Sequence, residues 1–219
     1  MAKVLIFGTS DFAQLANFYL ENDSEHEVVG FTVHSEYMNA TEFSGKPVFA
    51  FDSLFEEFSP ENYMLFAPMA PIKMNSARQA VFEEGRKMGF RFVSYVSSKA
   101  IYYGTPVGEN CFIFESNVIQ PFTKIGDNVI MWSGNHFGHH SSIGSHSFLA
   151  SHVVVSGHVE IGKNCFLGVN STVSNGIQIA DFSFVGAGAL IGRSTEPYSV
   201  YPGAKAEKSS IPSNKLRGA

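Results

Sequence analysis

The sequence has little cysteine, little tryptophan and no concentration of basic charge. Two of its 219 residues are cysteine, one is tryptophan, and charged residues make up only 16%. Two thiols do not make a disulfide framework, so we expect both to stay reduced. Lysine and arginine form no run, and the net charge is −5. Because phosphate binding needs a basic surface, this balance argues against nucleic acid as a partner.

Long apolar runs are also missing. No run approaches the roughly 20 residues that a membrane-spanning helix needs, and the first residues read as a buried strand rather than a signal peptide. Hydrophobic residues nevertheless make up 44% of the chain, which is enough to fill a globular core. We therefore expect a soluble, cytoplasmic protein without membrane insertion.

What the chain does have is a repeat of six residues. Every sixth residue is apolar over fifteen consecutive positions, a period that neither a helix nor an isolated strand shows. Such hexapeptides predict short strands wound into a solenoid, with three strands and about eighteen residues per coil. Residues 107–196 would then form about five coils of a parallel β-helix. The inward apolar positions are Val107, Ile113, Ile119, Ile125, Met131, Phe137, Ile143, Leu149, Val155, Ile161, Leu167, Val173, Ile179, Val185 and Ile191.

The third residue after each apolar one predicts the corners of the coils. It is mostly Asn, Gly or His, the residue types that tolerate a left-handed backbone conformation. His140, His146, His152 and His158 hold this position, so we interpret them as turn residues rather than metal ligands. Successive corners lie on different edges of the solenoid, and only His140 and His158 would share an edge within one chain. A metal site between subunits stays open.

The fourth residue after each apolar one is small or β-branched in most repeats, which suits a second and tighter inward position. Cys111 and Cys165 both hold it, 54 residues or three coils apart. That spacing separates them by roughly 14 Å and excludes a disulfide between them. We expect both to be small core residues.

Two histidines fall outside the corner rule. His139 lies two residues after Phe137, and His136 lies directly before it. A histidine that the repeat does not require is the better functional candidate, because imidazole exchanges protons near neutral pH. His139 is the stronger candidate of the two from its spacing, and His136 the weaker.

The first hundred residues alternate between strand and helix patterns, which predicts a small parallel α/β sheet. Ligands in such sheets bind at the carboxyl ends of the strands. The turn at residues 8–13 lies at that edge, and it fits either a helix N-terminus that holds phosphate or a plain strand-to-helix turn. Strands are predicted at 4–8, 28–33, 63–67 and 90–95, and helices at 14–21, 52–58 and 75–88.

The predicted fold class is thus an α/β N-terminal domain with a small parallel sheet, followed by a parallel β-helix. We place the α/β domain at residues 1–96, a linker at 97–106, the β-helix at 107–196 and a C-terminal tail at 197–219.

This organisation resembles one family across nearly the whole chain. Residues 156–171 are similar to the central coil, and residues 185–189 to a later coil, of the bacterial nucleotide-aminosugar N-acetyltransferases. That hexapeptide-repeat family includes the bacillosamine and perosamine N-acetyltransferases and the related sialic acid O-acetyltransferases. The resemblance implies a left-handed β-helix, a homotrimer, acetyl-CoA as acyl donor and a nucleotide-linked amino sugar as acceptor.

The resemblance also implies site residues. The family's general base corresponds to His139, and its neighbouring carboxylate is replaced by His140; we count His136 with them. Positions for acetyl-CoA correspond to Phe148, Gly168, Val169, Gly186 and Ala187. Positions for the nucleotide sugar correspond to Gly8, Thr9, Ser10, Asp11, Val33, His34 and Pro68. No metal is expected.

The functional expectation is acetyl transfer to the amine of a nucleotide-linked amino-dideoxy sugar for surface polysaccharide, with His139 as base. A sugar O-acetyltransferase is the first alternative. A zinc enzyme of the β-helix carbonic anhydrase type is another, because histidines cluster at residues 136–158. A noncatalytic assembly scaffold is a third.

Overall fold

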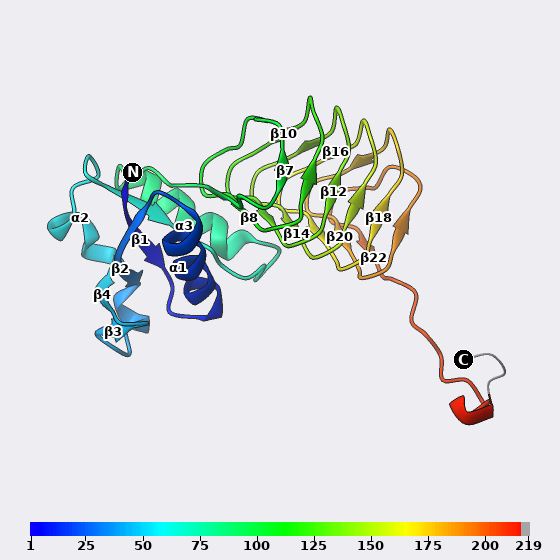
Figure 1. Ribbon diagram of the computed structural model, residues 1–219, viewed down its shortest axis with the longest axis horizontal. Coiled ribbons are helices and arrows are strands. Elements are labelled where there is room, and N and C mark those ends of the chain that lie inside the picture. The colour runs from blue at the N-terminus through cyan, green and yellow to red at the C-terminus, as the bar shows by residue number, and fades with distance from the viewer. Residues whose placement is uncertain (216–219) are drawn as a thin grey trace.

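The computed structural model describes residues 1–215, and Figure 1 shows two parts joined end to end. An α/β part holds the N-terminus, and a stack of coils follows it. After the last strand the chain leaves the stack as an extended segment that ends in the short helix η3 (Ser213–Lys215). Among residues 1–215, no helix is long and apolar enough to cross a membrane.

The α/β part is built on a five-stranded sheet in the order β3-β4-β2-β1-β5, parallel except for the β3–β4 pair. Its strands are β1 (Lys3–Phe7), β2 (Glu27–Val33), β3 (Glu42–Phe43), β4 (Lys46–Ala50) and β5 (Tyr63–Phe66). Its helices are α1 (Asp11–Asp23), η1 (Ser35–Tyr37), η2 (Phe51–Ser53), α2 (Leu54–Glu57) and α3 (Ser76–Lys87).

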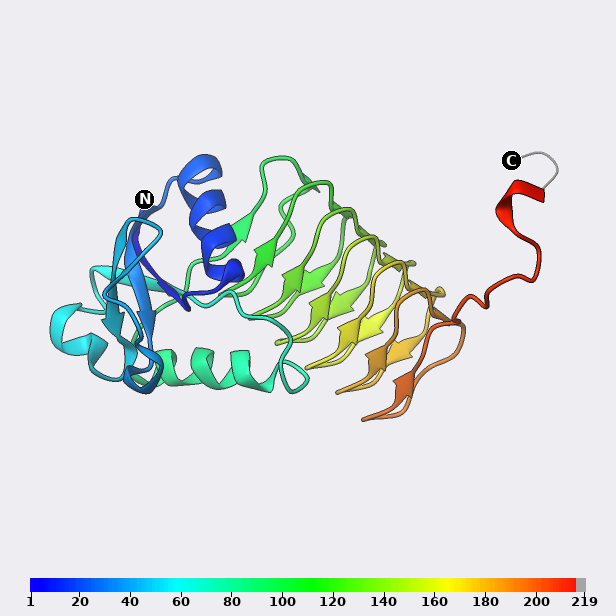
Figure 2. The same cartoon turned by 90° about the horizontal axis from the view of Figure 1, so that it is seen from below.

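The alternation of side chains along β1 separates two cores. Val4 and Ile6 pack with the buried face of α1, whereas Leu5 and Phe7 pack with α3. Figure 2 shows these two helices on opposite sides of the sheet. The sheet is therefore the middle of three layers.

The predicted order of strands and helices differs from the structure at three places, one of which is the short helix η1 that was not predicted. The segment predicted as a strand at 90–95 makes a single bridge, from Phe92 to Leu65, before it enters the coils. The short strands β3 and β4 were not predicted, because two and five residues give little periodic pattern.

The coils form three parallel sheets, one for each face of a prism. The seven-stranded sheet contains β6 (Tyr95–Val96), β8 (Phe112–Ile113), β11 (Ile130–Met131), β14 (Phe148–Leu149), β17 (Phe166–Leu167), β20 (Phe184–Val185) and β22 (Val200–Tyr201). The six-stranded sheet contains β7 (Ile101–Tyr102), β9 (Val118–Ile119), β12 (His136–Phe137), β15 (Val154–Val155), β18 (Thr172–Val173) and β21 (Leu190–Ile191). The four-stranded sheet contains β10 (Lys124–Ile125), β13 (Ser142–Ile143), β16 (Glu160–Ile161) and β19 (Gln178–Ile179).

The six-residue period is confirmed in the core of the coils. From Ile113 to Ile191 every predicted inward position is buried, and Val107 packs against the same cluster. The two cysteines are buried and unpaired, as predicted. The predicted corner positions have positive φ from Asn110 to Gly188, and Ser194 is the one predicted corner that does not. The strands β6, β7 and β22 add rungs before and after the region that the repeat marks.

The outward residues make the three faces chemically different. The four-stranded face carries polar residues: Lys124, Ser142, Glu160 and Gln178. The seven-stranded face carries mainly aromatic residues, and the α/β part covers its first half, where Phe112, Ile130 and Phe148 join the α1 core. The six-stranded face carries Ile101, Val118, His136, Val154, Thr172 and Leu190, of which Leu190 is 72% exposed.

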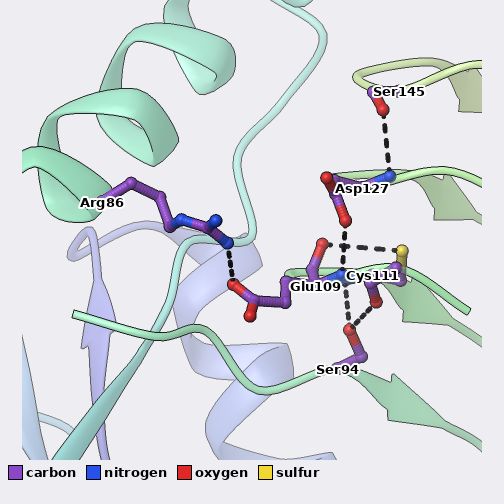
Figure 3. Close-up of polar contacts among 7 residues, drawn as sticks. Arg86, Ser94, Glu109, Cys111, Asp127 and Ser145 are labelled. Atoms are coloured by element: carbon purple, nitrogen blue, oxygen red, sulfur yellow. Dashed lines mark hydrogen bonds and ion pairs between the residues drawn. The ribbon is translucent and has the colours of Figure 1, made fainter. Parts of the chain in front are cut away.

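Two arginines of α3 fasten the α/β part to the coils. Arg78 is fully buried and donates hydrogen bonds to the carbonyls of His146 (2.9 Å), Ser147 (3.3 Å) and Met69 (3.2 Å). Arg86 pairs with Glu109 at the edge of the first coils, as Figure 3 shows. There Asp127 accepts the Glu109 N–H through its carboxylate, so the ion pair is tied to the neighbouring coil.

Candidate functional site

The strongest candidate site lies at the corner between β12 and β13. The left-handed conformation of His140 turns the chain there and leaves His139 exposed. Gln120 Oε1 accepts a hydrogen bond from the His139 N–H (2.9 Å), which fixes this turn to the preceding coil. His139 Nδ1 lies 3.0 Å from His140 Nδ1, close enough for one ring to donate to the other.

The opposite edge of the His139 ring lies over a glycine. A Cβ atom on Gly157 would come within 2.8 Å of both Cε1 and Nε2 of His139, and within 3.2 Å of Asn175 Oδ1. A side chain at residue 157 would therefore displace the ring. The arrangement pairs Nδ1 with His140 and leaves Nε2 without a hydrogen-bond partner among the residues described, on an exposed side chain. An unpaired ring nitrogen is what a general base requires.

His158 joins this corner from the next coil. Its ring stacks on His140 at 4.9 Å and meets His139 edge-on at 5.1 Å. Phe122 covers the other face of His140 at 4.8 Å. The structure thus places the rings of His139 and His140 in contact and adds His158, which the sequence placed on the same edge as His140.

His136 does not point to this corner. It is the outward residue of β12 and is half-buried between Val118 and Val154 in the rows of the six-stranded sheet. Two apolar neighbours and a flat sheet face give it no polar partner among the residues described. Its placement favours a role on that face rather than with His139.

Four of the five predicted acetyl-CoA positions meet at a different corner, between the seven-stranded and six-stranded sheets. Val169 and Ala187 are exposed there one coil apart, and the buried glycines Gly168 and Gly186 precede them. A Cβ on Gly168 would lie 2.6 Å from the Ala187 nitrogen, so this glycine is explained by the close stacking of coils. Phe148 lies elsewhere: it is 4% exposed, within the core that joins the two parts.

The seven predicted nucleotide-sugar positions lie at the carboxyl ends of β1, β2 and β5, and five of them border two clefts. Ser10, Asp11 and Pro68 line one of about 350 Å³, together with Phe12 and Met69. Thr9 and Val33 line another of about 210 Å³. Gly8 makes the turn between β1 and α1 with a φ of +107°, and its N–H donates to the carbonyl of Thr32.

His34 lies outside both clefts. Its Nε2 is 3.0 Å from Glu84 Oε2 on α3, and its ring meets Phe7 and Phe51 edge-on. Ser35 N donates to Asp52 Oδ2 beside it (2.6 Å), and this contact lowers the pKa of the Asp52 carboxyl. The pairing with Glu84 gives His34 a structural partner between β2 and α3.

Another cleft, of about 370 Å³, contains no residue that the sequence singled out. Tyr19, Asp23 and Glu115 line it where α1 meets the first coils. Hydrogen bonds from Ser98 and Tyr95 lower the pKa of Asp23 to about 2, while burial and the bond to Glu115 raise the pKa of Tyr19 to about 12. These groups are partners of one another across a junction, a relation that no local pattern in the sequence reveals.

The comparisons with known proteins agree with this architecture. A family model described as the hexapeptide repeat of succinyl-transferase matches residues 158–193. A search of the curated proteins gives no match. Among solved structures, PerB from Caulobacter crescentus, in complex with CoA and GDP-perosamine, has a TM-score of 0.76 at 22% identity, over 93% of this chain and 92% of that one.

A second similar structure is the acetyltransferase domain of PglB from Neisseria gonorrhoeae, with a TM-score of 0.75 at 17% identity, over 90% of this chain and 94% of that one. The same domain in complex with acetyl coenzyme A gives 0.72 at 16% identity, over 86% and 92%. These comparisons confirm, as a shared fold, the resemblance that the sequence carries: an α/β domain with a parallel sheet followed by a left-handed β-helix.

Proposed function

We propose that the protein is an acetyl-CoA-dependent N-acetyltransferase that acts on the amine of a nucleotide-linked amino-dideoxy sugar. A 4-amino-4,6-dideoxyhexose destined for surface polysaccharide is the preferred acceptor. The observation that carries the proposal is the exposed His139 ring on a corner of the coils, paired through Nδ1 and without a partner at Nε2 among the residues described. The similar Caulobacter structure holds CoA and GDP-perosamine, which supports the same substrate classes here.

In the proposed reaction His139 Nε2 accepts a proton from the sugar amine while the amine nitrogen attacks the thioester carbonyl of acetyl-CoA. The carbon–nitrogen bond forms, the carbon–sulfur bond breaks, and the proton goes on to the departing CoA thiolate. His140 holds the His139 ring through its Nδ1, where the family has a carboxylate. Unlike a carboxylate, an imidazole carries no negative charge that could stabilise an imidazolium, so orientation is the role that we assign to His140.

In one active site, the residues that bind acetyl-CoA and the residue that acts as base would come from different subunits. His139 lies on the corner between the six-stranded and four-stranded sheets, whereas Val169 and Ala187 lie on the corner between the seven-stranded and six-stranded sheets. The face between these two corners is the six-stranded one, whose outward residues include the exposed Val154 and Leu190. Packing of this face against neighbouring copies would bury it and bring the two corners together, which supports a homotrimer.

The nucleotide would bind at the carboxyl edge of the α/β sheet. The cleft beside Ser10 and Pro68 lies next to the first turn of α1, where free N–H groups favour phosphate oxygens. The cleft beside Thr9 and Val33 is the second subsite on this edge. We assign the nucleotide sugar to these two clefts and leave His34 to its pairing with Glu84.

Product analysis tests the function. The protein is incubated with acetyl-CoA and a panel of nucleotide-linked 4-amino and 3-amino dideoxy sugars, and products are weighed by mass spectrometry before and after hydroxylamine. One added acetyl group that survives hydroxylamine is an amide and is the expected result. An acetyl group that hydroxylamine removes is an ester and would replace the proposal with O-acetylation. Absence of product from every amino sugar would overturn the choice of acceptor.

A further inference from the structure

Three histidine rings lie close together at the exposed corner. One ring nitrogen from each of His139, His140 and His158 lies within 4.8 Å of the others. The closest pair, the Nδ1 atoms of His139 and His140, is 3.0 Å apart. Two nitrogen ligands at about 2.0–2.1 Å from a tetrahedral ion are separated by about 3.3 Å, so this pair is already near that spacing.

The coils hold the rings in place without help from an ion. His140 and His158 occupy equivalent corners of successive coils, and their rings are stacked 15° from parallel. His139 stands at 88° to both, so its edge faces the pair. The His158 N–H donates to the His139 carbonyl (2.9 Å), which couples the two coils at this point. Because imidazole lone pairs lie in the ring planes, the stacked His140 and His158 rings do not yet both face one ion. Rotation of one exposed ring about its Cβ–Cγ bond would bring three nitrogens onto one ion.

The chemistry of this donor set is selective. Imidazole nitrogens suit zinc, copper, nickel and cobalt, whereas magnesium and calcium prefer oxygen ligands. All three side chains are exposed, so the remaining coordination positions are open to water. Another group of potential metal ligands among the residues described consists of His34, Asp52 and Glu84. There His34 is paired with Glu84, and Asp52 accepts a hydrogen bond from the Ser35 N–H.

We propose that His139, His140 and His158 bind one divalent transition-metal ion, such as Zn²⁺, and that the bound ion switches acetyl transfer off. A neutral imidazole has one free lone pair, and an ion on either nitrogen of His139 takes it. His139 could then accept no proton from the substrate amine. The inhibitory half of this proposal rests on the proposed function, whereas the binding half does not.

Binding is tested with Co²⁺, whose visible absorption depends on its ligands and geometry. Titration of the wild-type protein is expected to give one bound Co²⁺ per chain, which Zn²⁺ displaces. His158→Asn should weaken binding by about tenfold or more, since it removes one of three ligands. Asparagine holds the equivalent left-handed corner at Asn164, so this variant keeps the coil.

His152→Asn is the matched control, because His152 is an exposed corner histidine on another edge of the coils. It should leave Co²⁺ binding unchanged. Failure of the wild type to bind Co²⁺, or equal binding by the His158→Asn variant, would overturn the site.

Inhibition is tested by adding Zn²⁺ to the acetyl-transfer assay. Activity should fall in step with occupancy and return when the ion is chelated, and the inhibition curve of His158→Asn should shift by the same factor as its binding constant. Zinc occupancy without loss of activity would overturn the inhibitory half. If no substrate is acetylated at all, the proposed function fails, and the Co²⁺ titration still decides the metal site.

Discussion

His140 and His146 occupy the same position of consecutive hexapeptides, and both adopt the left-handed conformation of a corner. Their surroundings differ in every other respect. His140 is exposed and pairs with His139, whereas His146 is 9% exposed, bonded to Asn128 and placed under α3. The residue one coil earlier is Phe122 for His140 and Asn128 for His146. The repeat determines the backbone at both corners, and the covering layer determines the chemistry.

The buried corner shows what that cover does. Burial and the positive charge of Arg78 lower the pKa of His146 to about 4, so its ring is neutral under most conditions. Arg78 itself keeps no carboxylate partner among the residues described, and burial lowers its pKa to about 9. At the exposed corner the histidines remain available to substrate or to an ion. Variants at each corner can therefore test whether the covering layer causes this difference.

The largest effect is expected at the exposed corner. His139→Ala should lower kcat by about 10²–10⁴, the usual contribution of a general base. Steady-state kinetics with the substrate found by product analysis would measure it, and His152→Ala provides a matched exposed histidine on another edge. A loss below about tenfold would contradict the assignment, because the amine would then arrive neutral and need no base at this corner.

Arg78→Met should cause the largest loss of stability, about 3 kcal/mol. The carbonyls of His146, Ser147 and Met69 would lose a charged donor inside the core. Denaturant unfolding measures the change. Arg86→Met on the same helix is the control: its ion pair with Glu109 is half-exposed, and we expect no more than about 1 kcal/mol there. Equal losses in both variants would refute the special role of Arg78.

The third prediction concerns acid sensitivity. Between pH 6.5, the ordinary pKa of histidine, and the value of about 4 for His146, the unfolded chain binds a proton that the folded chain does not. The free energy of unfolding should therefore decrease by up to about 3 kcal/mol as pH falls through this window, and this contribution stays constant below it.

His146→Asn should flatten that part of the pH profile. Asn110 already donates to Asn128 Oδ1 along the same edge (2.8 Å), so an asparagine suits this corner. His152→Asn should leave the slope as it is. Urea unfolding across the window checks both variants, and an unchanged slope in His146→Asn would show that other groups cause the acid sensitivity.

The sequence predicted the periodic parts of the molecule and missed the contacts between distant parts. The six-residue pattern gives the inward residues and the corners, because each coil repeats one local geometry. Arg78 carries no such signal: it is one polar residue of a helix, and its partners lie 68 and 69 residues further along. Its burial follows from how α3 docks on the coils.

In the candidate site, too, local features could be predicted from the sequence and contacts between distant residues could not. The nearness of His139 and His140 follows from their adjacency in the chain, and the resemblance assigns His139 to the position of the base with His140 in place of the neighbouring carboxylate. The approach of the His158 ring to His139 could not be predicted, because it depends on side-chain directions across coils. Phe148 is the reverse case: the resemblance assigned it to acetyl-CoA, and the docking of the α/β part buries it.

The smallest expected effect is a gain in stability at Phe122. This residue is 73% exposed and has a φ of 66°, a conformation that strains bulky side chains and that asparagine tolerates. Phe122→Asn places an asparagine one coil before His140, as Asn128 lies one coil before His146. Relief of strain should raise the free energy of unfolding by about 1 kcal/mol, reduced by the lost contact with His140. Denaturant unfolding would reveal the balance, and a net loss would mean that the aromatic cover of His140 outweighs the backbone strain beneath it.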